Sequence, residues 1–270
     1  MPELPEVETR RRGIEPHLVG PHIVDVTIRD RRLRWPISED VDNHLRGQTV
    51  TSVDRRAKYL LINTTGGAAI LHLGMSGHVS IVARDTPAGI HDHVDIVLAS
   101  RQALRLRDPR RFGSLHWSDD PYAHWLLRDL GPEPLGDEFS GDYLWRKSRG
   151  RRVAVKQFIM NANVVVGVGN IYASEALFRA GIHPKRAAGR ISLQRYEALA
   201  DSIRSVLQRA IRAGGTTLRD YYGGFGEAGW FQQELDVYGR EDEPCHCCDR
   251  PVTAIVQGQR ATYYCRNCQT

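Results

Sequence analysis

Cysteine is scarce in this chain of 270 residues, and all five cysteines fall in the last 26 positions. Long apolar runs are missing as well, since none approaches the roughly 18 residues that span a bilayer. The first six residues, Met-Pro-Glu-Leu-Pro-Glu, are acidic and do not resemble a secretory signal. No internal repeat is visible. We therefore expect an intracellular protein of the cytoplasm with no membrane partner.

The cysteines that are present form two close pairs, Cys245-x-x-Cys248 and Cys265-x-x-Cys268. This spacing is typical of a closed site in which four thiolates surround one Zn²⁺ ion. A tail this short cannot fold around a core of its own, so the metal would supply the folding energy. Four thiolates leave no open coordination position. The pattern therefore predicts one structural zinc and not a catalytic one.

Two other uses of these cysteines are weaker. Two disulfides could form from the same residues, but the acidic start argues against an oxidising compartment. His246 and Cys247 are alternative ligands, although the two-residue spacing favours the outer cysteines.

Positive charge is modest overall but clustered along the chain. The net charge is +5, and basic residues gather around Arg31, Arg55, Arg107 and Arg151. Clustered cations together with a zinc ribbon favour a nucleic-acid partner over an ordinary solvated surface.

The chain changes its pattern near residue 131. Pro5 suits the first turn of an initial helix. From about 22 to 118 the pattern has period two, which predicts an antiparallel sandwich or barrel. The strand candidates lie at 24–28, 59–62, 68–73, 79–82, 94–98 and 104–107. A Gly- and Pro-rich stretch at 131–136 reads as a linker.

Beyond that linker the pattern is helical. Ser192 can cap a helix that ends at Gly214, and a second helix should run from Asn170 to Ala180 after a glycine-rich turn. Such a turn can hold a phosphate, although glycines more often serve packing. A further glycine-rich segment, 223–229, reads as a loop that could order on substrate binding or as a plain connector.

Several motifs, in order along the whole chain, resemble the bacterial formamidopyrimidine-DNA glycosylases. They are MPELPEVETR at 1–10, RRAKYL at 55–60, HLGMSG at 72–77, HDHVD at 91–95, DPRRFG at 108–113, VGVGNIYA at 166–173, GGTTL at 214–218, VYGR at 237–240 and QRATYYC at 259–265.

The resemblance implies an α+β protein of two domains. An N-terminal antiparallel β-sandwich with flanking helices would occupy 1–131, and a hinge 132–150. A helical domain with a helix-two-turn-helix would occupy 151–235, and the Cys₄ zinc finger 236–270. The partner would be double-stranded DNA that contains oxidised purines or abasic sites, bound by a monomer that works at the nucleoid.

Pro2 is the nucleophile that the resemblance implies. Removal of Met1 would expose a secondary amine, and an α-amine with a pKa near 7.7–8.0 is roughly a tenth free base at pH 7. A lysine near 10.4 has only a few parts in ten thousand as free base, on the order of a hundredfold less. Attack on the sugar C1′ would give an iminium ion, which acidifies the C2′ proton and permits strand cleavage by elimination.

The resemblance implies three further catalytic residues. Glu3 would protonate the ribose ring oxygen as a general acid. Lys58 would act as a proton donor near the damaged nucleotide in β-elimination. Arg260, in the turn of the zinc ribbon, would grip backbone phosphates and assist δ-elimination. Without the resemblance, Glu3 reads as a helix-start carboxylate and Lys58 as a phosphate contact.

The remaining site residues are implied as DNA contacts. Reaching a base in a duplex requires extruding it, and three residues match the family's inserted side chains, namely Met75, Arg110 and Phe112. On composition alone Met75 and Phe112 would be core residues. Four others match phosphate-contacting positions, namely His91, Arg152, Lys156 and Asn170. The chain departs from the family at Asn161 and Asn163, where an aspartate and a lysine are frequent, and Arg152 replaces a lysine.

The expected activity is that of a bifunctional DNA glycosylase and abasic-site lyase acting on 8-oxoguanine and formamidopyrimidines by β,δ-elimination. The pyrimidine-specific branch of the superfamily is the nearest alternative, and Leu4 favours the purine branch because glycine is usual there in the other. A zinc-dependent DNA-binding regulator without catalysis is a further alternative. A metallohydrolase would need an open metal site that the sequence lacks.

Overall fold

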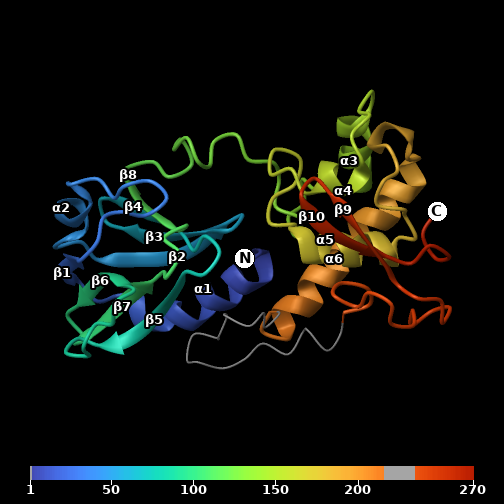
Figure 1. Cartoon of the computed structure of the whole chain (residues 1–270). Helices are drawn as coiled ribbons and strands as arrows, with labels where there is room; N and C mark the ends of the chain where they lie inside the picture. Colours follow the sequence, from blue (N-terminus) through green and yellow to red (C-terminus); the bar gives the residue numbers. More distant parts are fainter. Residues whose placement is uncertain (1, 216–234) are drawn as a thin grey trace. The chain divides into compact units, whose positions relative to one another are not determined.

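The computed structural model describes residues 2–215 and 235–270 (Figure 1). The described residues divide into two compact units, one of residues 2–128 with 214–215 and one of 129–213 with 235–270. The predicted loop at 223–229 lies outside the described residues. In the described part, no helix is long and apolar enough to cross a membrane.

The first unit is the predicted antiparallel β-sandwich. One sheet has the order β1-β6-β7-β5, with bounds Ile23–Ile28, Asp92–Leu98, Gln102–Arg107 and His78–Ala83. The other has the order β2-β3-β4-β8, with bounds Val50–Arg56, Tyr59–Thr64, Gly67–His72 and Ser114–Ser118. All pairings within them are antiparallel. Alternate residues of both sheets, such as Val26, Leu104, Val53 and Leu71, form one shared core.

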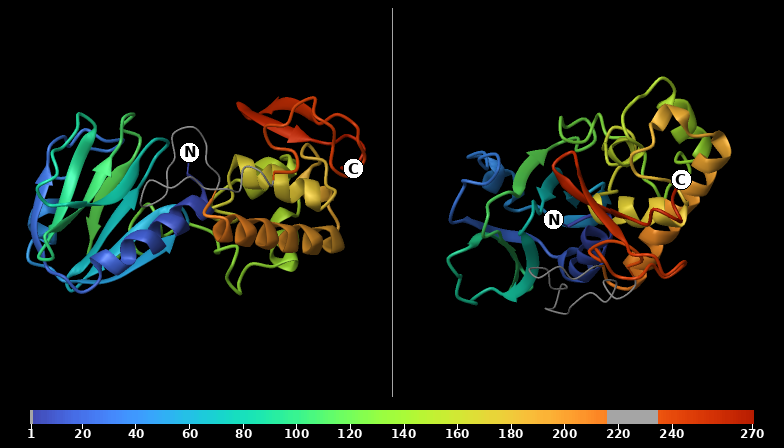
Figure 2. Two further views of the ribbon diagram at one scale, coloured as in Figure 1. Left: turned by 90° about the horizontal axis from the view of Figure 1, so that it is seen from below. Right: turned by 45° about the vertical axis from the view of Figure 1, so that its right-hand side comes forward.

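Two helices flank this sandwich. Helix α1 (Leu4–Leu18) has Pro5 in its first turn, as predicted, and packs along β2 and β5 (Figure 2). The short helix α2 (Val41–Leu45) packs on β1 and β8. Helix α1 buries Val7, Ile14 and Leu18, so its narrow apolar stripe faces the core.

Strand β6 is buried along all seven residues, including Asp92 and Asp95. Arg105 on the neighbouring β7 donates two hydrogen bonds of 2.8 Å to Asp95, and Arg29 donates another. Burial alone would raise the pKa of Asp95, but these hydrogen bonds and charges outweigh it and lower that pKa. The carboxylate therefore stays ionised and paired inside the unit.

The second unit is helical and carries the Cys-rich tail. Its helices are α3 (Gly141–Ser148), α4 (Val155–Ile159), α5 (Asn170–Arg179) and α6 (Leu193–Arg212), with a short 3₁₀ turn η1 (Ala188–Arg190). Ser192 caps α6 by accepting a hydrogen bond from the Arg195 backbone, as predicted. Helix α6 packs against α3 and α5. Helix α3 falls inside the stretch predicted as a hinge, and the finer domain boundaries stay a prediction.

A β-hairpin, β9 (Thr253–Gln257) and β10 (Arg260–Tyr264), follows in the tail and packs on α5 (Figures 1 and 2). Gly258 and Gln259 at its tip both have positive φ, +56° and +61°. Two consecutive residues with positive φ form a tight turn whose twist matches that of the two strands it joins. This turn is followed directly by Arg260.

Candidate nucleic-acid interface and metal centre

The start of the chain is buried where α1 begins. Pro2 and Glu3 are both buried, and only 3% of Glu3 is exposed. Glu3 is the N-cap residue of α1, and its backbone N–H donates a 2.8 Å hydrogen bond to Glu6 Oε2. In return, the Glu3 side chain contacts the backbone N–H of Glu6. This capping box fixes the direction in which the chain enters the helix. The helix therefore holds Pro2 and Glu3 in a defined position.

Lys58 lies in the two-residue turn between β2 and β3, where Ala57 has a φ of +56°. Its charge acts on His72, at the end of β4. Burial lowers the pKa of His72, and the charges of Lys58 and Arg34 lower it further, to about 4. The Gly74 backbone donates to His72 Nδ1 at 3.1 Å, which fits a neutral imidazole. The imidazole near Lys58 is therefore neutral at pH 7.

Met75, Arg110 and Phe112 sit on two adjoining loops of the first unit. Met75 is 41% exposed and Phe112 is 42% exposed, so neither is the core residue that composition alone would suggest. The Arg110 guanidinium lies 4.9 Å from the centre of the Phe112 ring. Gly74 has a φ of +60°, and a Cβ there would come within 2.3 Å of the Phe112 carbonyl carbon. Glycine therefore allows the two loops to touch.

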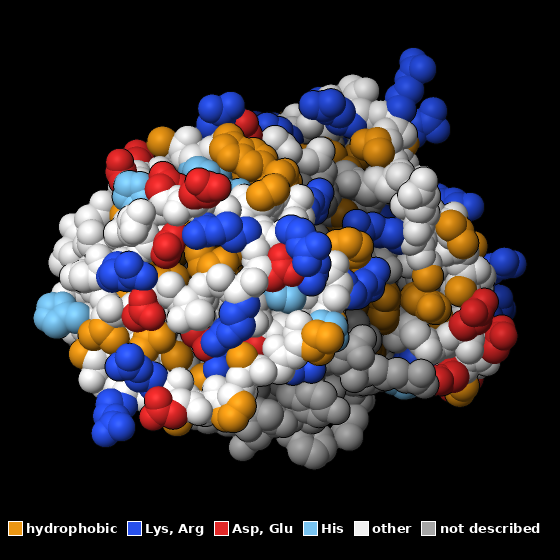
Figure 3. All heavy atoms as spheres, turned by 60° about the vertical axis from the view of Figure 1, so that its left-hand side comes forward, with side chains coloured by type: hydrophobic (Ala, Val, Ile, Leu, Met, Phe, Trp, Pro, Cys, Tyr) orange, Lys and Arg blue, Asp and Glu red, His pale blue; other side chains and the backbone are white. Residues whose placement is uncertain are grey.

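Many of the clustered arginines are already paired. Arg31 pairs with Asp42, Arg32 and Arg111 pair with Asp30, and Arg107 lies 3.7 Å from Asp92. On the face shown in Figure 3, Lys and Arg side chains are spread among Asp and Glu side chains. The positive charge of the clusters around Arg31 and Arg107 is therefore partly neutralised by neighbouring aspartates, which the sequence did not indicate.

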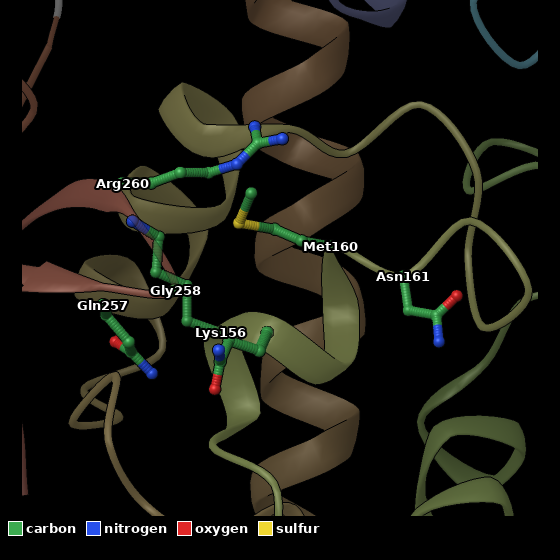
Figure 4. A pocket seen from close by; sticks show the side chains of 7 residues that line it. Lys156, Met160, Asn161, Gln257, Gly258 and Arg260 are labelled. Atoms are coloured by element: carbon green, nitrogen blue, oxygen red, sulfur yellow. The ribbon is translucent and has the colours of Figure 1, made fainter.

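A hollow of about 200 Å³ in the second unit gathers two of the predicted site residues, Lys156 and Arg260 (Figure 4). It is lined by Lys156, Gln157, Met160, Asn161, Gln257, Gly258 and Arg260. Arg260 is exposed, and the Met160 side chain points toward it. The hollow therefore places the cationic side chain of Arg260, from the hairpin, beside helix α4 and the turn that follows it.

Lys156 is the buried member of this group, with 2% of its surface exposed. Its ammonium donates to Asn170 Oδ1 and Thr262 Oγ1 at 2.7 Å and to the Ala261 carbonyl at 3.3 Å. Asn170 Nδ2 donates to the same carbonyl at 2.9 Å. Helices α4 and α5 and strand β10 therefore meet at one charged centre. Arg152 is exposed and is not among the residues that line the hollow.

The two departures have structural roles of their own. Asn161 Oδ1 accepts from the Asn163 backbone at 3.0 Å, and Asn163 Nδ2 donates to the Asp129 carbonyl at 3.0 Å. These bonds shape the turn that follows α4, as asparagine side chains commonly do.

The four predicted cysteines come together and could hold a metal ion. Their sulfur atoms all lie within 4.8 Å of one another, and the distances are 3.9 Å for Cys245–Cys268 and 3.5 Å for Cys248–Cys265. A tetrahedral Zn²⁺ with Zn–S bonds near 2.3 Å separates its sulfurs by about 3.8 Å, so the group fits. Cys247 is exposed and lies outside the group.

The comparisons with known proteins agree with this geometry. A family model described as the formamidopyrimidine-DNA glycosylase N-terminal domain matches residues 1–115, and one described as the H2TH domain of the same enzymes matches 130–221. This chain belongs to the formamidopyrimidine-DNA glycosylase family. Its similarity to curated members is extensive. It is 62% identical over 269 residues to the enzyme of Stutzerimonas stutzeri (strain A1501) and 60% identical to that of Pseudomonas entomophila (strain L48), with 100% of each chain covered.

Solved structures show the same architecture. The MutM (Fpg) protein of Thermus thermophilus is 38% identical, with a TM-score of 0.89 over 99% of this chain and 98% of that one. The Lactococcus lactis Fpg in complex with DNA containing N7-benzyl-Fapy-dG is 33% identical, with a TM-score of 0.91 over 100% of both chains. The predicted family and the predicted fold class are confirmed.

Sequence reasoning missed two residues that shape this family member's site. The carboxylate of Glu175 on α5 accepts hydrogen bonds from the backbone of Asp236, Val237 and Tyr238 at 2.8, 3.0 and 2.8 Å. Burial raises the pKa of Glu175 against the opposing effect of these donors. The bonds attach the segment before the cysteines to α5. The other missed residue, Asp108, belongs to a motif that the sequence singled out without assigning it a role.

Proposed function

We propose that this family member frees damaged purines by attack of the Pro2 nitrogen on the sugar and then cleaves the strand by β,δ-elimination. As a formamidopyrimidine-DNA glycosylase it is a bifunctional glycosylase and abasic-site lyase of base-excision repair, acting on formamidopyrimidine and other oxidised purines. The observation that carries this is the 62% identity to a curated member over the full length of both chains. Its substrate, chromosomal DNA, would place the enzyme in the cytoplasm at the nucleoid.

The start of the chain would supply the covalent chemistry. Once Met1 is removed, Pro2 would present a secondary amine with Glu3 as its direct neighbour. The amine would bond to C1′ while Glu3 protonates the ring oxygen and the base departs, which leaves an iminium ion. Loss of the C2′ proton would then expel the 3′-phosphate. The burial of both residues at the start of α1 supports this assignment, because it holds the amine and the carboxyl next to each other in a fixed position.

The other predicted residues would bind and position the DNA. Lys58 would donate a proton during elimination. Met75 and Phe112 would fill the space that the extruded base leaves, and Arg110 would offer donors to its former partner. His91, Arg152, Lys156, Asn170 and Arg260 would contact phosphates. Arg260 would also assist δ-elimination, which is supported by its exposed position at the hairpin tip.

The metal would be one zinc ion held by Cys245, Cys248, Cys265 and Cys268. When bound it would supply rigidity only, because four thiolates leave no position for a water or a substrate. The cysteines pack with Phe178, Val237 and Val252 in a small core, so metal binding and folding of the tail would be coupled.

A trapping experiment tests the covalent mechanism. The native enzyme is incubated with a duplex carrying 8-oxoguanine opposite cytosine, and borohydride is added to reduce the iminium to a stable adduct. We expect a covalent complex. It should be lost when Met1 is retained, because the Pro2 nitrogen is then part of a peptide bond. Release of the base without any adduct would refute the Pro2 mechanism. A parallel duplex with thymine glycol separates the purine specificity from that of the pyrimidine-specific branch.

The role of Glu3 is tested by comparing two reactions of Glu3→Gln. Loss of a general acid should slow base release by about 10² to 10⁴-fold. Cleavage of a pre-formed abasic site should persist, because no base has to leave. Glu15→Gln is the matched control, since Glu15 lies on the same helix with a side chain that is 40% exposed. Equal effects of Glu3→Gln on both reactions would contradict the assignment.

A further inference from the structure

Asp108 is a fully buried carboxylate that no step of the proposed reaction uses. It follows β7, and 0% of its surface is exposed. Its Oδ1 accepts a 2.9 Å hydrogen bond from Ser76 Oγ, and its Oδ2 accepts a 2.7 Å hydrogen bond from the Gly113 backbone. A buried charge of this kind is costly unless donors satisfy it. Here the donors belong to two different loops.

These two loops carry the three predicted inserted residues. Ser76 is next to Met75, and Gly113 is next to Phe112. Ser76 Oγ also accepts a 3.2 Å hydrogen bond from the Arg110 backbone. The Ser76 hydroxyl and the Asp108 carboxylate therefore link the Met75 loop to both ends of the 110–113 turn.

The backbone of Asp108 reaches a third segment, the start of β6. Its N–H donates to the His91 carbonyl at 3.0 Å, and its carbonyl lies 2.9 Å from His93 Nε2. His91 is a predicted phosphate contact. Asp108 is thus bonded to the segments of Met75, His91, Arg110 and Phe112, which carry predicted DNA contacts of the first unit.

The surroundings leave these loops little freedom at their base. A Cβ at Gly113 would come within 2.7 Å of the His72 carbonyl and 3.0 Å of Asp108 Oδ2. The Gly113 carbonyl accepts from the Arg34 backbone at 3.0 Å, and Arg111 pairs with Asp30 at 2.6 Å. The side chains of Met75 and Phe112, by contrast, are more than a third exposed. The buried contacts of the two loops therefore determine where the exposed side chains of Met75 and Phe112 lie.

We propose that Asp108 and Ser76 are positioning residues that hold Met75 in register with Arg110 and Phe112, and that discrimination of the base opposite the lesion depends on this pair. Reading an opposite base requires donors fixed to a fraction of an ångström, and an ordered supporting shell is what provides such precision. The inference rests on the proposed function, since it assigns these tips to the DNA.

Two variants test it with the full-length enzyme. Ser76→Ala removes the hydroxyl that joins Asp108 to Arg110. Asp108→Asn keeps the size but replaces one acceptor oxygen with a donor, which opposes either Ser76 or Gly113. For each variant the rates of 8-oxoguanine release opposite cytosine and opposite adenine are measured, together with cleavage of a pre-formed abasic site. We expect the ratio of the two release rates to fall by about three- to tenfold, the range for one lost hydrogen bond, with abasic-site cleavage retained.

The control is Ser52→Ala, which removes another serine–aspartate hydrogen bond, the 3.0 Å bond to Asp54 on β2. Its rate ratio should equal that of the native enzyme, and Ser76→Thr should restore the ratio because it keeps a hydroxyl. A native rate ratio in both Ser76→Ala and Asp108→Asn would overturn the inference. A parallel loss of all three activities would also overturn it, since that indicates a role in folding alone. If the native enzyme releases no 8-oxoguanine, the proposed function fails instead.

Discussion

At the scale of single residues, His72 links the protonation of one ring to the stability of the loop before Met75. Its folded-state pKa of about 4 lies below the value of 6.5 expected in the unfolded chain. The neutral ring therefore contributes stability that is complete above pH 6.5 and is lost as the pH falls through about 4. Each pKa unit corresponds to about 1.4 kcal/mol, so full protonation would cost on the order of 3 to 4 kcal/mol.

The measurement is the thermal midpoint of the native chain and of His72→Gln between pH 7.5 and 4. The midpoint of the native chain should fall toward that of the variant over this range. The His72 ring signal in a proton NMR titration should move near pH 4. Parallel midpoint curves, or a ring that titrates near 6.5, would contradict the prediction.

Individual functional residues were predictable wherever their chemistry is local. Four cysteines in two close pairs define a metal site by spacing alone, and the structure brings those four sulfurs together. Pro2 and Glu3 became candidates through the resemblance, because a proline at position two carries no signal by itself. Asp108 and Ser76 lie in two of the motifs but received no role, because they are 32 residues apart and their bond exists only once two loops have folded against each other. No periodicity or spacing encodes such a contact.

At the scale of secondary-structure elements, Lys156 joins α4, α5 and β10. Lys156→Met would remove the charge and leave Asn170 Oδ1 and Thr262 Oγ1 without this donor. We expect weaker binding to a duplex with an uncleavable abasic analogue, and a slope of log K against log salt that is smaller by about 1. Fluorescence anisotropy at several salt concentrations measures both quantities.

Lys147→Met provides the matched control for this change, since Lys147 is exposed on α3 in the same unit. This variant should keep most of the native affinity. Equal salt slopes for Lys156→Met and the native chain would show that Lys156 contributes no charge to the DNA contact.

Elements were predictable where one face is apolar. Six strand candidates correspond to β1, β3, β4, β5, β6 and β7, and Ser192 marks the start of α6. Strand β2 was missed because its sequence, VTSVDRR, has only two buried residues, Val50 and Val53. Helix α3 was not predicted, because the Gly- and Pro-rich stretch before it indicated a hinge over 132–150. Strand β6 was found, but its complete burial was not foreseen, because that depends on Arg105 and Arg29 neutralising Asp95.

At the scale of the whole molecule, the metal should decide whether the C-terminal tail folds. Cys265→Ser removes a fully buried sulfur from the four-cysteine group. The bound zinc should fall from about one per chain to near zero, since a three-thiolate site is no longer closed. DNA affinity should fall with it, because the hairpin that carries Arg260 loses its support. Elemental analysis and anisotropy measure the two outcomes.

Cys247→Ser is the control for that experiment, because Cys247 is exposed and outside the group. It should keep both the metal and the affinity. Retention of zinc by Cys265→Ser, or its loss from Cys247→Ser, would show that the ligand set is a different one.

The β9–β10 hairpin carries Arg260 at its tip, with the four cysteines at one end of β10 and the Lys156 hydrogen bonds to Ala261 and Thr262 at the other. The six residues from Arg260 to Cys265 are separated by five steps and span about 17 Å in an extended strand. A rotation of only about ten degrees at the cysteine end would therefore swing the guanidinium by about 3 Å, the length of a hydrogen bond. If Arg260 contacts the strand as proposed, a rigid four-cysteine site would therefore set the accuracy of that contact, although none of its residues would touch the damaged nucleotide.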